Sequence, residues 1–131
     1  MIEGRFDEEG KLLFEIGLVT ADGEIILTDA LLDTGFTGWV AINTQDLDFG
    51  WLLVKAKERM KTAQGETDFK IYAGVVQIDG EEFTVPVLAG EGIPEIIIGF
   101  QWLKTRRLVV DFPTVHSPSK ETVELKYVFR I

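Results

Sequence analysis

The stretch ALLDTGFTGWVAI, residues 30 to 42, places an aspartate, a threonine and a glycine between two apolar runs. Two short buried strands joined by a turn explain this pattern, because aspartate begins turns, threonine satisfies local backbone groups and glycine adopts unusual backbone angles. An ionisable side chain among apolar neighbours costs free energy unless it has partners or a task. The stretch therefore predicts either an ordinary turn or a functional carboxylate at Asp33.

The sequence before this stretch predicts a hairpin. Residues 11–19 (KLLFEIGLV) and 24–32 (EIILTDALL) are rich in strand-forming side chains, and Asp22-Gly23 between them suits a tight turn. Residues 38–42 predict a further short strand after the DTG. Residues 43–50 (NTQDLDFG) offer a capping asparagine, an acidic first turn and a closing glycine, which together predict one short helix.

The rest of the chain also indicates strands. They are predicted at residues 51–56, 69–78, 81–89, 96–99, 108–112 and 122–131, with a second tight turn at Asp79-Gly80. A second short helix is predicted at residues 100–107, where Arg106 and Arg107 either complement the carboxyl end of the helix or mark a processing site. The pattern indicates a single all-β domain over residues 1–131 with two short helices.

Composition and charge exclude several classes of function. The 131 residues carry a formal net charge of −9, which opposes binding to nucleic acids and anionic membranes. No apolar run approaches the roughly 20 residues of a membrane span, and the acidic start lacks the basic segment of a signal peptide. The absence of cysteine removes thiolate metal sites and cysteine nucleophiles, and it fits a reducing compartment. We therefore expect a cytoplasmic protein that binds neither nucleic acid nor membrane.

Two motifs resemble those of the retropepsin-like aspartic proteases, the family of the retroviral proteases and their bacterial relatives. The first is LLDTGFTG at residues 31–38, and the second is EIIIGFQWL at residues 95–103, where aliphatic residues precede a glycine and a helix. Gly99 follows Asp33 by 66 positions (99 − 33), a spacing similar to that of the single-domain members. The resemblance covers residues 11–112, and it implies a closed, orthogonal β-barrel that works as a homodimer.

The resemblance implies a role for each matched residue. Asp33 is expected to be the catalytic aspartate, Thr34 to brace the active-site loop across the dimer interface, and Gly35 to let a substrate backbone come close. A hairpin within residues 58–72 is expected to close over a peptide or protein substrate. The residues expected to contact that substrate are Phe36, Thr37, Gln64, Gly65, Ile97 and Ile98. The reaction implied by the family needs no cofactor and no metal ion.

The chain departs from the retroviral pattern at two places. Retroviral members usually have a small residue and then an aspartate after the DTG, whereas this chain has Phe36 and Thr37. They also have an arginine after the second glycine, whereas this chain has Phe100. That aspartate and arginine form an ion pair near the active site, so both halves of the pair are missing together. Bacterial relatives with DTGF look similar, and the departure therefore concerns the substrate pockets.

An aspartic protease needs two carboxyl groups, and this chain has one DTG. The two groups lie about 3 Å apart and share one proton, because like charges at that distance cannot both ionise. One carboxylate acts as general base on a water while the other polarises the scissile carbonyl. A single chain of this length supplies such a pair only as a symmetric dimer.

Two functions follow from these observations. The first is an aspartic endopeptidase that hydrolyses peptide bonds at a homodimer interface, which the intact DTG favours. The alternative is a catalytically silent member of the same fold that serves as a dimerisation or peptide-binding module.

The C-terminal part of the chain is a candidate for the dimer interface. Residues 113–131 extend beyond the part that resembles the family, and they include the alternating segment 122–131. This segment and residues 108–112 (LVVDF) predict either strands of an intersubunit sheet or ordinary edge strands of one chain.

Overall fold

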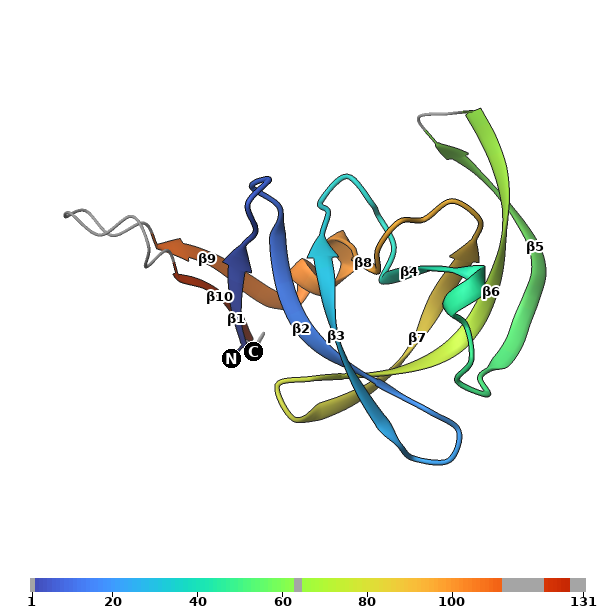
Figure 1. Ribbon diagram of the computed structural model, residues 1–131, viewed down its shortest axis with the longest axis horizontal. Coiled ribbons are helices and arrows are strands. Elements are labelled where there is room, and N and C mark those ends of the chain that lie inside the picture. Colours follow the sequence, from blue (N-terminus) through green and yellow to red (C-terminus); the bar gives the residue numbers. More distant parts are fainter. Residues whose placement is uncertain (1, 63–64, 112–121, 128–131) are drawn as a thin grey trace.

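The computed structural model describes residues 2–62, 65–111 and 122–127, which form ten strands and two short 3₁₀-helices (Figure 1). The strands are β1 (Ile2–Phe6), β2 (Leu12–Val19), β3 (Ile25–Leu32), β4 (Val40–Asn43), β5 (Leu52–Thr62), β6 (Gly65–Ile78), β7 (Glu81–Gly90), β8 (Ile97–Ile98), β9 (Arg106–Asp111) and β10 (Thr122–Tyr127). The 3₁₀-helices are η1 (Thr44–Asp46) and η2 (Phe100–Lys104). The predicted all-β class is confirmed. None of the described helices has the length and apolar character that a membrane crossing requires.

All ten strands belong to one mixed sheet. Their order is β5-β6-β7-β4-β8-β3-β2-β1-β10-β9, and β6 also pairs with β2. This additional pairing joins the two ends of the series β6-β7-β4-β8-β3-β2, so six strands form a closed ring. β8 runs parallel to β3 and β4 runs parallel to β7, while the other pairs are antiparallel. The sheet therefore curls into a barrel, with β1, β10 and β9 extending from one side and β5 from the other.

The two tight turns predicted from Asp-Gly pairs join the expected strands. Gly23 has a φ of +85° in the β2–β3 hairpin, where the Thr20 backbone N–H donates to the Glu24 carbonyl over 2.8 Å. Asp79 and Gly80, between β6 and β7, have φ values of +56° and +76°. Positive φ at both positions is typical of a type I′ turn, whose twist matches that of the flanking strands.

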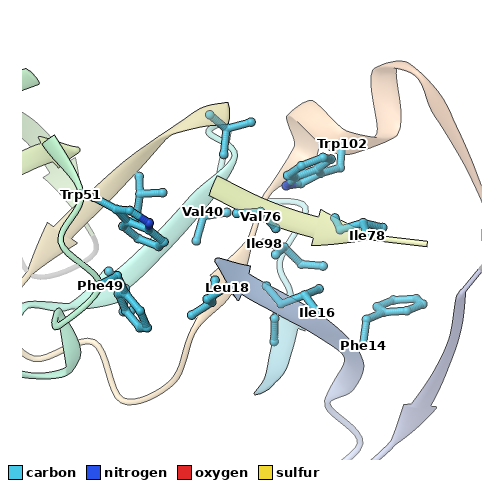
Figure 2. Packing of buried hydrophobic residues seen from close by; sticks show 14 of the residues in the cluster. Phe14, Ile16, Leu18, Val40, Phe49, Trp51, Val76, Ile78, Ile98 and Trp102 are labelled. Atoms are coloured by element: carbon cyan, nitrogen blue, oxygen red, sulfur yellow. The ribbon is translucent and has the colours of Figure 1, made fainter. Parts of the chain in front are cut away.

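The core lies inside the ring of strands, and Figure 2 shows its packing. β2 and β6 contribute the alternate residues Phe14, Ile16, Leu18, Val76 and Ile78, all of them buried. One end of the core holds Trp51, which stacks on Phe49 with ring centroids 4.6 Å apart. The other end holds Trp102, which is fully buried and meets Trp39 and Phe83 edge to face. Each of the three tryptophans is therefore a packing residue.

Both predicted helices are shorter than expected. The helix expected at residues 43–50 is reduced to η1, although Asn43 caps it as predicted by accepting a hydrogen bond from the Gln45 backbone N–H at 2.9 Å. The helix expected at residues 100–107 ends at Lys104, because the chain enters β9 at Arg106. Arg106 is 3% exposed, and its guanidinium lies 4.7 Å from the Phe83 ring centre and 5.1 Å from that of Trp102. The interpretation of Arg106 as a helix-end cation or processing site is therefore wrong.

An ion pair fixes β1 to β3 across the intervening strand β2. Arg5 donates two hydrogen bonds to the carboxylate of Asp29, at 3.0 and 2.6 Å. Both side chains remain about half exposed, so water screens the pair. The hydrogen bonds from Arg5, together with its charge, lower the pKa of Asp29 below the ordinary aspartate value.

The stability contributed by Asp29 should depend on pH. Because the pKa of Asp29 is lowered in the folded state, its stabilising effect is present above the unfolded pKa of about 3.9 and is lost as the pH falls through the folded pKa. Asp29→Asn should therefore unfold at lower urea concentration than wild type at pH 7, and the difference should vanish in strong acid. Asp22→Asn, at the exposed tip of the β2–β3 hairpin, is the control. An equal loss for Asp29→Asn at pH 7 and pH 2 would show that the carboxylate charge contributes nothing.

Candidate functional site

Asp33 begins the loop that joins β3 to β4. Its backbone N–H donates to the Ile98 carbonyl at 3.0 Å, and its own carbonyl accepts from the Phe36 N–H at 3.1 Å, which closes a turn. The Gly35 N–H donates to Asp33 Oδ1 at 2.9 Å and orients the carboxylate. Asp33 is exposed, and within the described part of the chain its Oδ2 atom has no hydrogen-bond partner. One carboxylate oxygen is therefore held by the loop, on a side chain that is exposed.

The two strands that flank this loop do not pair with each other. β8 lies between them, parallel to β3 through the pairs Leu31–Ile97 and Leu32–Ile98 and antiparallel to β4. The Leu31 N–H also donates to the Ile96 carbonyl at 2.8 Å. The two sequence motifs, far apart along the chain, are thus joined strand to strand. The position of Asp33 is set by the sheet and not by the turn alone.

Gly99 allows the loop to lie directly on the end of β8. A Cβ atom built on Gly99 would lie 2.2 Å from the Gly38 carbonyl oxygen and 2.7 Å from that of Phe36. The backbone is hydrogen-bonded at this contact, since the Gly99 N–H donates to the Trp39 carbonyl at 2.9 Å. A side chain at position 99 would have to displace backbone, so the glycine is required by close approach and not by its backbone angle.

The departures from the retroviral pattern have a structural counterpart. The Phe36 ring packs against Gly38 and Gly99, where an added Cβ would meet ring atoms at 2.6 and 2.7 Å. The Phe100 N–H donates to the Phe36 carbonyl at 2.8 Å, which ties the start of η2 to the loop. The Phe36 ring and backbone hydrogen bonds therefore hold the loop in this chain, with Phe36 where the retroviral pattern has a small residue and Phe100 where it has an arginine.

A cavity of about 470 Å³ opens beside Asp33. Its lining is largely apolar and comes from the loop, the sheet and the β5–β6 hairpin. The lining residues are Asp33, Gly35, Phe36, Ala41, Met60, Lys61, Phe69, Leu88, Ile93 and Ile97. An exposed carboxylate at the edge of an apolar cavity of this size is the arrangement expected of a site for a small molecule or a peptide side chain.

The β5–β6 hairpin has one apolar face and one charged face near its tip. Met60 and Phe69 line the cavity, and Phe69 rests on Gly90, where an added Cβ would lie 2.3 Å from the ring. Alternate positions carry Arg59 and Asp68, which are cross-strand partners with a nitrogen–oxygen distance of 3.6 Å. Because side chains alternate between the faces of a strand, the hairpin presents its apolar residues to the cavity and its ion pairs to solvent.

The structure brings several predicted site residues together and separates others. Asp33, Gly35, Phe36 and Ile97 all line the cavity. Thr34 and Thr37 are exposed on the same loop but do not line it.

Ile98, predicted to contact substrate, is fully buried in the core, so this assignment is wrong. It alternates with Ile97 along β8, and only Ile97 reaches the cavity. Gly65 lies in the last pair of the hairpin, opposite Thr62, and not in the cavity lining. Gln64 lies outside the described residues.

Sequence reasoning missed most of the cavity wall. The lining residues that it did not identify are Ala41, Met60, Lys61, Phe69, Leu88 and Ile93. A signal was present for two of them, because Met60 and Phe69 are the large apolar residues in an otherwise polar hairpin, KERMKT and ETDFK. Their spacing from the turn places them on one face of the hairpin. Of the others, Lys61 lies next to Met60 in β5, and Ala41, Leu88 and Ile93 come from β4, β7 and the loop before β8; nothing local in the sequence marks these four.

A second cavity, of about 340 Å³, lies on another part of the barrel. Leu18, Ile42 and Phe49 line it together with three acidic residues, Asp29, Asp46 and Glu95. Two of their carboxylates are occupied, since Asp29 is paired with Arg5 and Glu95 accepts a hydrogen bond from Lys11 at 2.9 Å. The larger cavity at Asp33 is therefore the better candidate for chemistry.

Comparisons with known proteins add no identification. No protein-family model matches the chain, and no curated protein sequence matches it significantly. Among the described residues, no three His, Asp or Glu side chains are grouped closely enough to hold a metal ion. The chemistry of the site must therefore be argued from Asp33 and its surroundings.

Proposed function

We propose that the protein is an aspartic endopeptidase of the retropepsin type and that it works as a homodimer. The observation that carries this proposal is the position of Asp33, which lies at the edge of an apolar cavity beneath a hairpin, on a loop locked by β8. Its exposed carboxylate, held through Oδ1 alone among the described residues, is available to a second carboxyl group. The DTG and the aliphatic segment ending at Gly99 are also the two motifs that resemble this family, and they meet in the fold.

The proposed mechanism uses one Asp33 from each of two chains. The ionised carboxylate takes a proton from a water molecule, whose oxygen attacks the scissile carbonyl carbon. The protonated partner donates a hydrogen bond to the carbonyl oxygen and stabilises the tetrahedral intermediate. When the intermediate collapses, the carbon–nitrogen bond breaks, and the leaving nitrogen takes the proton that the first carboxylate received from water. Water and a peptide bond thus give a carboxylic acid and an amine, with no cofactor.

The surroundings of Asp33 support particular roles for other residues. Thr34 is exposed in the single chain, which leaves its hydroxyl free to brace the loop of a second copy. A Cβ on Gly35 would lie 3.1 Å from Asp33 Oδ1, so the glycine keeps the space next to the carboxylate open. Met60, Phe69 and Ile97 provide an apolar wall that suits an apolar side chain beside the scissile bond.

Cleavage that depends on protein concentration tests this proposal. The purified protein is incubated with a library of peptides containing apolar pairs, and cleavage sites are read by mass spectrometry. Activity per chain should rise with protein concentration and then level off, because only the dimer contains two carboxyl groups. Sedimentation over the same concentrations gives the fraction of dimer. Undiminished activity per chain at concentrations where the protein is monomeric would rule out the paired mechanism, and peptide binding without cleavage would support a silent binding module.

A further inference from the structure

β3 has a partner strand along nearly all of one edge but along only a small part of the other. β2 pairs with residues 25–31 of β3. On the opposite edge, β8 pairs only with Leu31 and Leu32. Within the described part of the chain, no other strand and no backbone hydrogen bond reaches this edge between Ile25 and Ala30. Most of β3 therefore has a free edge, which in Figure 1 runs from the level of β8 toward the tip of the β2–β3 hairpin.

The free edge presents backbone groups to an additional strand. Successive residues of a strand direct their N–H and C=O groups to alternate sides. The Leu31 N–H points toward β8, because it donates to the Ile96 carbonyl at 2.8 Å. Leu27 and Asp29 therefore direct their N–H groups to the same side, where β8 no longer covers β3. A row of unpaired N–H and C=O groups is a template to which an extended peptide can add.

The cavity of about 340 Å³ lies directly against this free edge. Ile26, Thr28 and Asp29 of β3 line it on one side. Core side chains also line it, namely the buried Leu18, Ile42 and Phe49. A segment that added to β3 would therefore find an apolar pocket for the side chains that it directs inward.

This cavity is separate from the one at Asp33. The two share no lining residue. Ile96 lines this cavity and Ile97 lines the other, and Ile42 and Ala41 divide in the same way. Because neighbouring residues of an extended chain face opposite sides, the two cavities lie on opposite faces of the β4–β8 pair. A segment bound at β3 would leave the Asp33 cavity unoccupied.

The surroundings of the free edge are negatively charged. Asp46 lines the cavity, is exposed, and has no ion-pair partner among the described residues. Asp29 and its cross-strand partner Glu15 both act on a single cation, Arg5. A segment that carries lysine or arginine would complement this charge. A second copy of the chain, with its net charge of −9, would not.

We propose that the free edge of β3 binds an extended segment of a partner protein in which apolar and basic residues alternate. The backbone of the segment pairs with Leu27 and Asp29, its apolar side chains enter the cavity, and its basic side chains lie near Asp29 and Asp46. The aliphatic stems of those basic side chains cover Leu27, which is 63% exposed. The interface uses no residue of the Asp33 cavity, so it goes beyond the proposed function and does not depend on it.

Hydrogen exchange tests where such a segment binds. The probe is the peptide Lys-Val-Lys-Val-Lys-Val-Lys, acetylated and amidated at its ends, added to the isotope-labelled protein. At saturation, exchange of the Leu27 and Asp29 amides, read by NMR, should slow by at least about ten-fold, because each amide becomes a donor to the peptide. Exchange of the Ile26 and Thr28 amides, which face β2, should change little. Slower exchange in the Asp33 loop or on the outer strands β5 and β9, in place of β3, would overturn the proposal.

A matched pair of variants tests the charge requirement. Asp46→Lys reverses the charge beside the cavity and should lower the affinity for this peptide by at least about ten-fold. Asp48→Lys makes the same change in net charge at an exposed position outside the cavity lining, and it should bind the peptide as wild type does. A peptide with glutamate in place of lysine should also bind wild type at least about ten-fold more weakly. Equal affinities of the two variants, or for the two peptides, would overturn the proposal.

A second copy of the chain is the competing occupant of the free edge. Slow exchange at Leu27 and Asp29 in the protein alone, increasing with protein concentration, would show that a second copy covers β3 and would overturn the proposal. Cleavage is measured separately. Peptide binding at β3 by a protein that hydrolyses nothing would refute the protease and keep this interface. Cleavage by a protein whose β3 amides never respond to the peptide would keep the protease and refute the interface.

Discussion

Replacing Asp33 by asparagine should abolish peptide cleavage while leaving the fold intact. The amide lacks the ionisable oxygen that takes a proton from water, and in a homodimer one substitution removes both carboxyl groups. General acid–base catalysis contributes about 10² to 10⁴-fold to enzyme rates, so the loss in kcat/KM should be at least about 10³-fold. The amide oxygen keeps the acceptor for the Gly35 N–H. The thermal unfolding midpoint should therefore not fall.

The control for this substitution is Asp22→Asn. Asp22 is an exposed aspartate that also precedes a turn glycine, and Asn-Gly is as favourable in a tight turn as Asp-Gly. This variant makes the same chemical change far from the cavity and should keep full activity. Wild-type turnover by Asp33→Asn would mean that Asp33 only shapes the turn, and the proposed protease function would then fail.

Adding a single methyl group at Gly99 should be the most damaging small change in the fold. The new Cβ of Gly99→Ala would lie 2.2 Å from the Gly38 carbonyl oxygen, and backbone cannot move aside as a flexible side chain does. The loop would separate from β8 and lose the hydrogen bonds around Phe36 and Trp39. We expect the free energy of unfolding to fall by at least about 3 kcal/mol, measured by urea denaturation.

Gly23→Ala separates steric overlap from backbone strain. Gly23 has a φ of +85° and nothing within 4 Å of an added Cβ. The free energy of unfolding of this variant should therefore fall only by the cost of placing alanine at a positive φ, about 1 kcal/mol. Gly99→Ala has the opposite problem, with no positive φ but a close backbone contact. If the two variants were equally stable, the close contact at Gly99 would not be what holds the loop.

The strands were predictable because their signals are local. Period-two alternation and the Asp-Gly turns marked β2, β3, β6 and β7 to within a residue or a few residues of their ends. β1 was missed, because IEGRF is short and mixed in character and forms a strand only between β2 and β10. The lengths of both helices were overestimated, because a local signal marks where a helix can begin and the surrounding fold decides where it ends. A favourable cap at Asn43 starts a helical turn, but the turn ends at Leu47, whose backbone angles are not helical, and β5 begins five residues later.

The candidate site was predictable only in part. The DTG identified Asp33, because a carboxylate between apolar strands is conspicuous in any sequence. The cavity wall was not predictable, since Leu88 reaches it through the pairing of β7 with β4 and Ile93 through the loop before β8, both far from Asp33 in the sequence. The error at Ile98 has a simple physical origin. Adjacent residues of a strand face opposite sides, and nothing in a run of three isoleucines indicates which of them faces the cavity.

The insertion of β8 between β3 and β4 also has a consequence for how the protein is made. Leu31 and Ile97 pair across 66 residues (97 − 31), so the loop of Asp33 cannot take its final shape until the chain has been synthesised past that point. Residues this distant in sequence must be brought together by loop closure, which costs entropy, before their contact stabilises the fold, and this slows folding. A nascent chain emerging from the ribosome therefore carries its aspartate in an unformed loop. A hydrolytic site assembled so late would be harmless to its own chain, and to others, throughout synthesis.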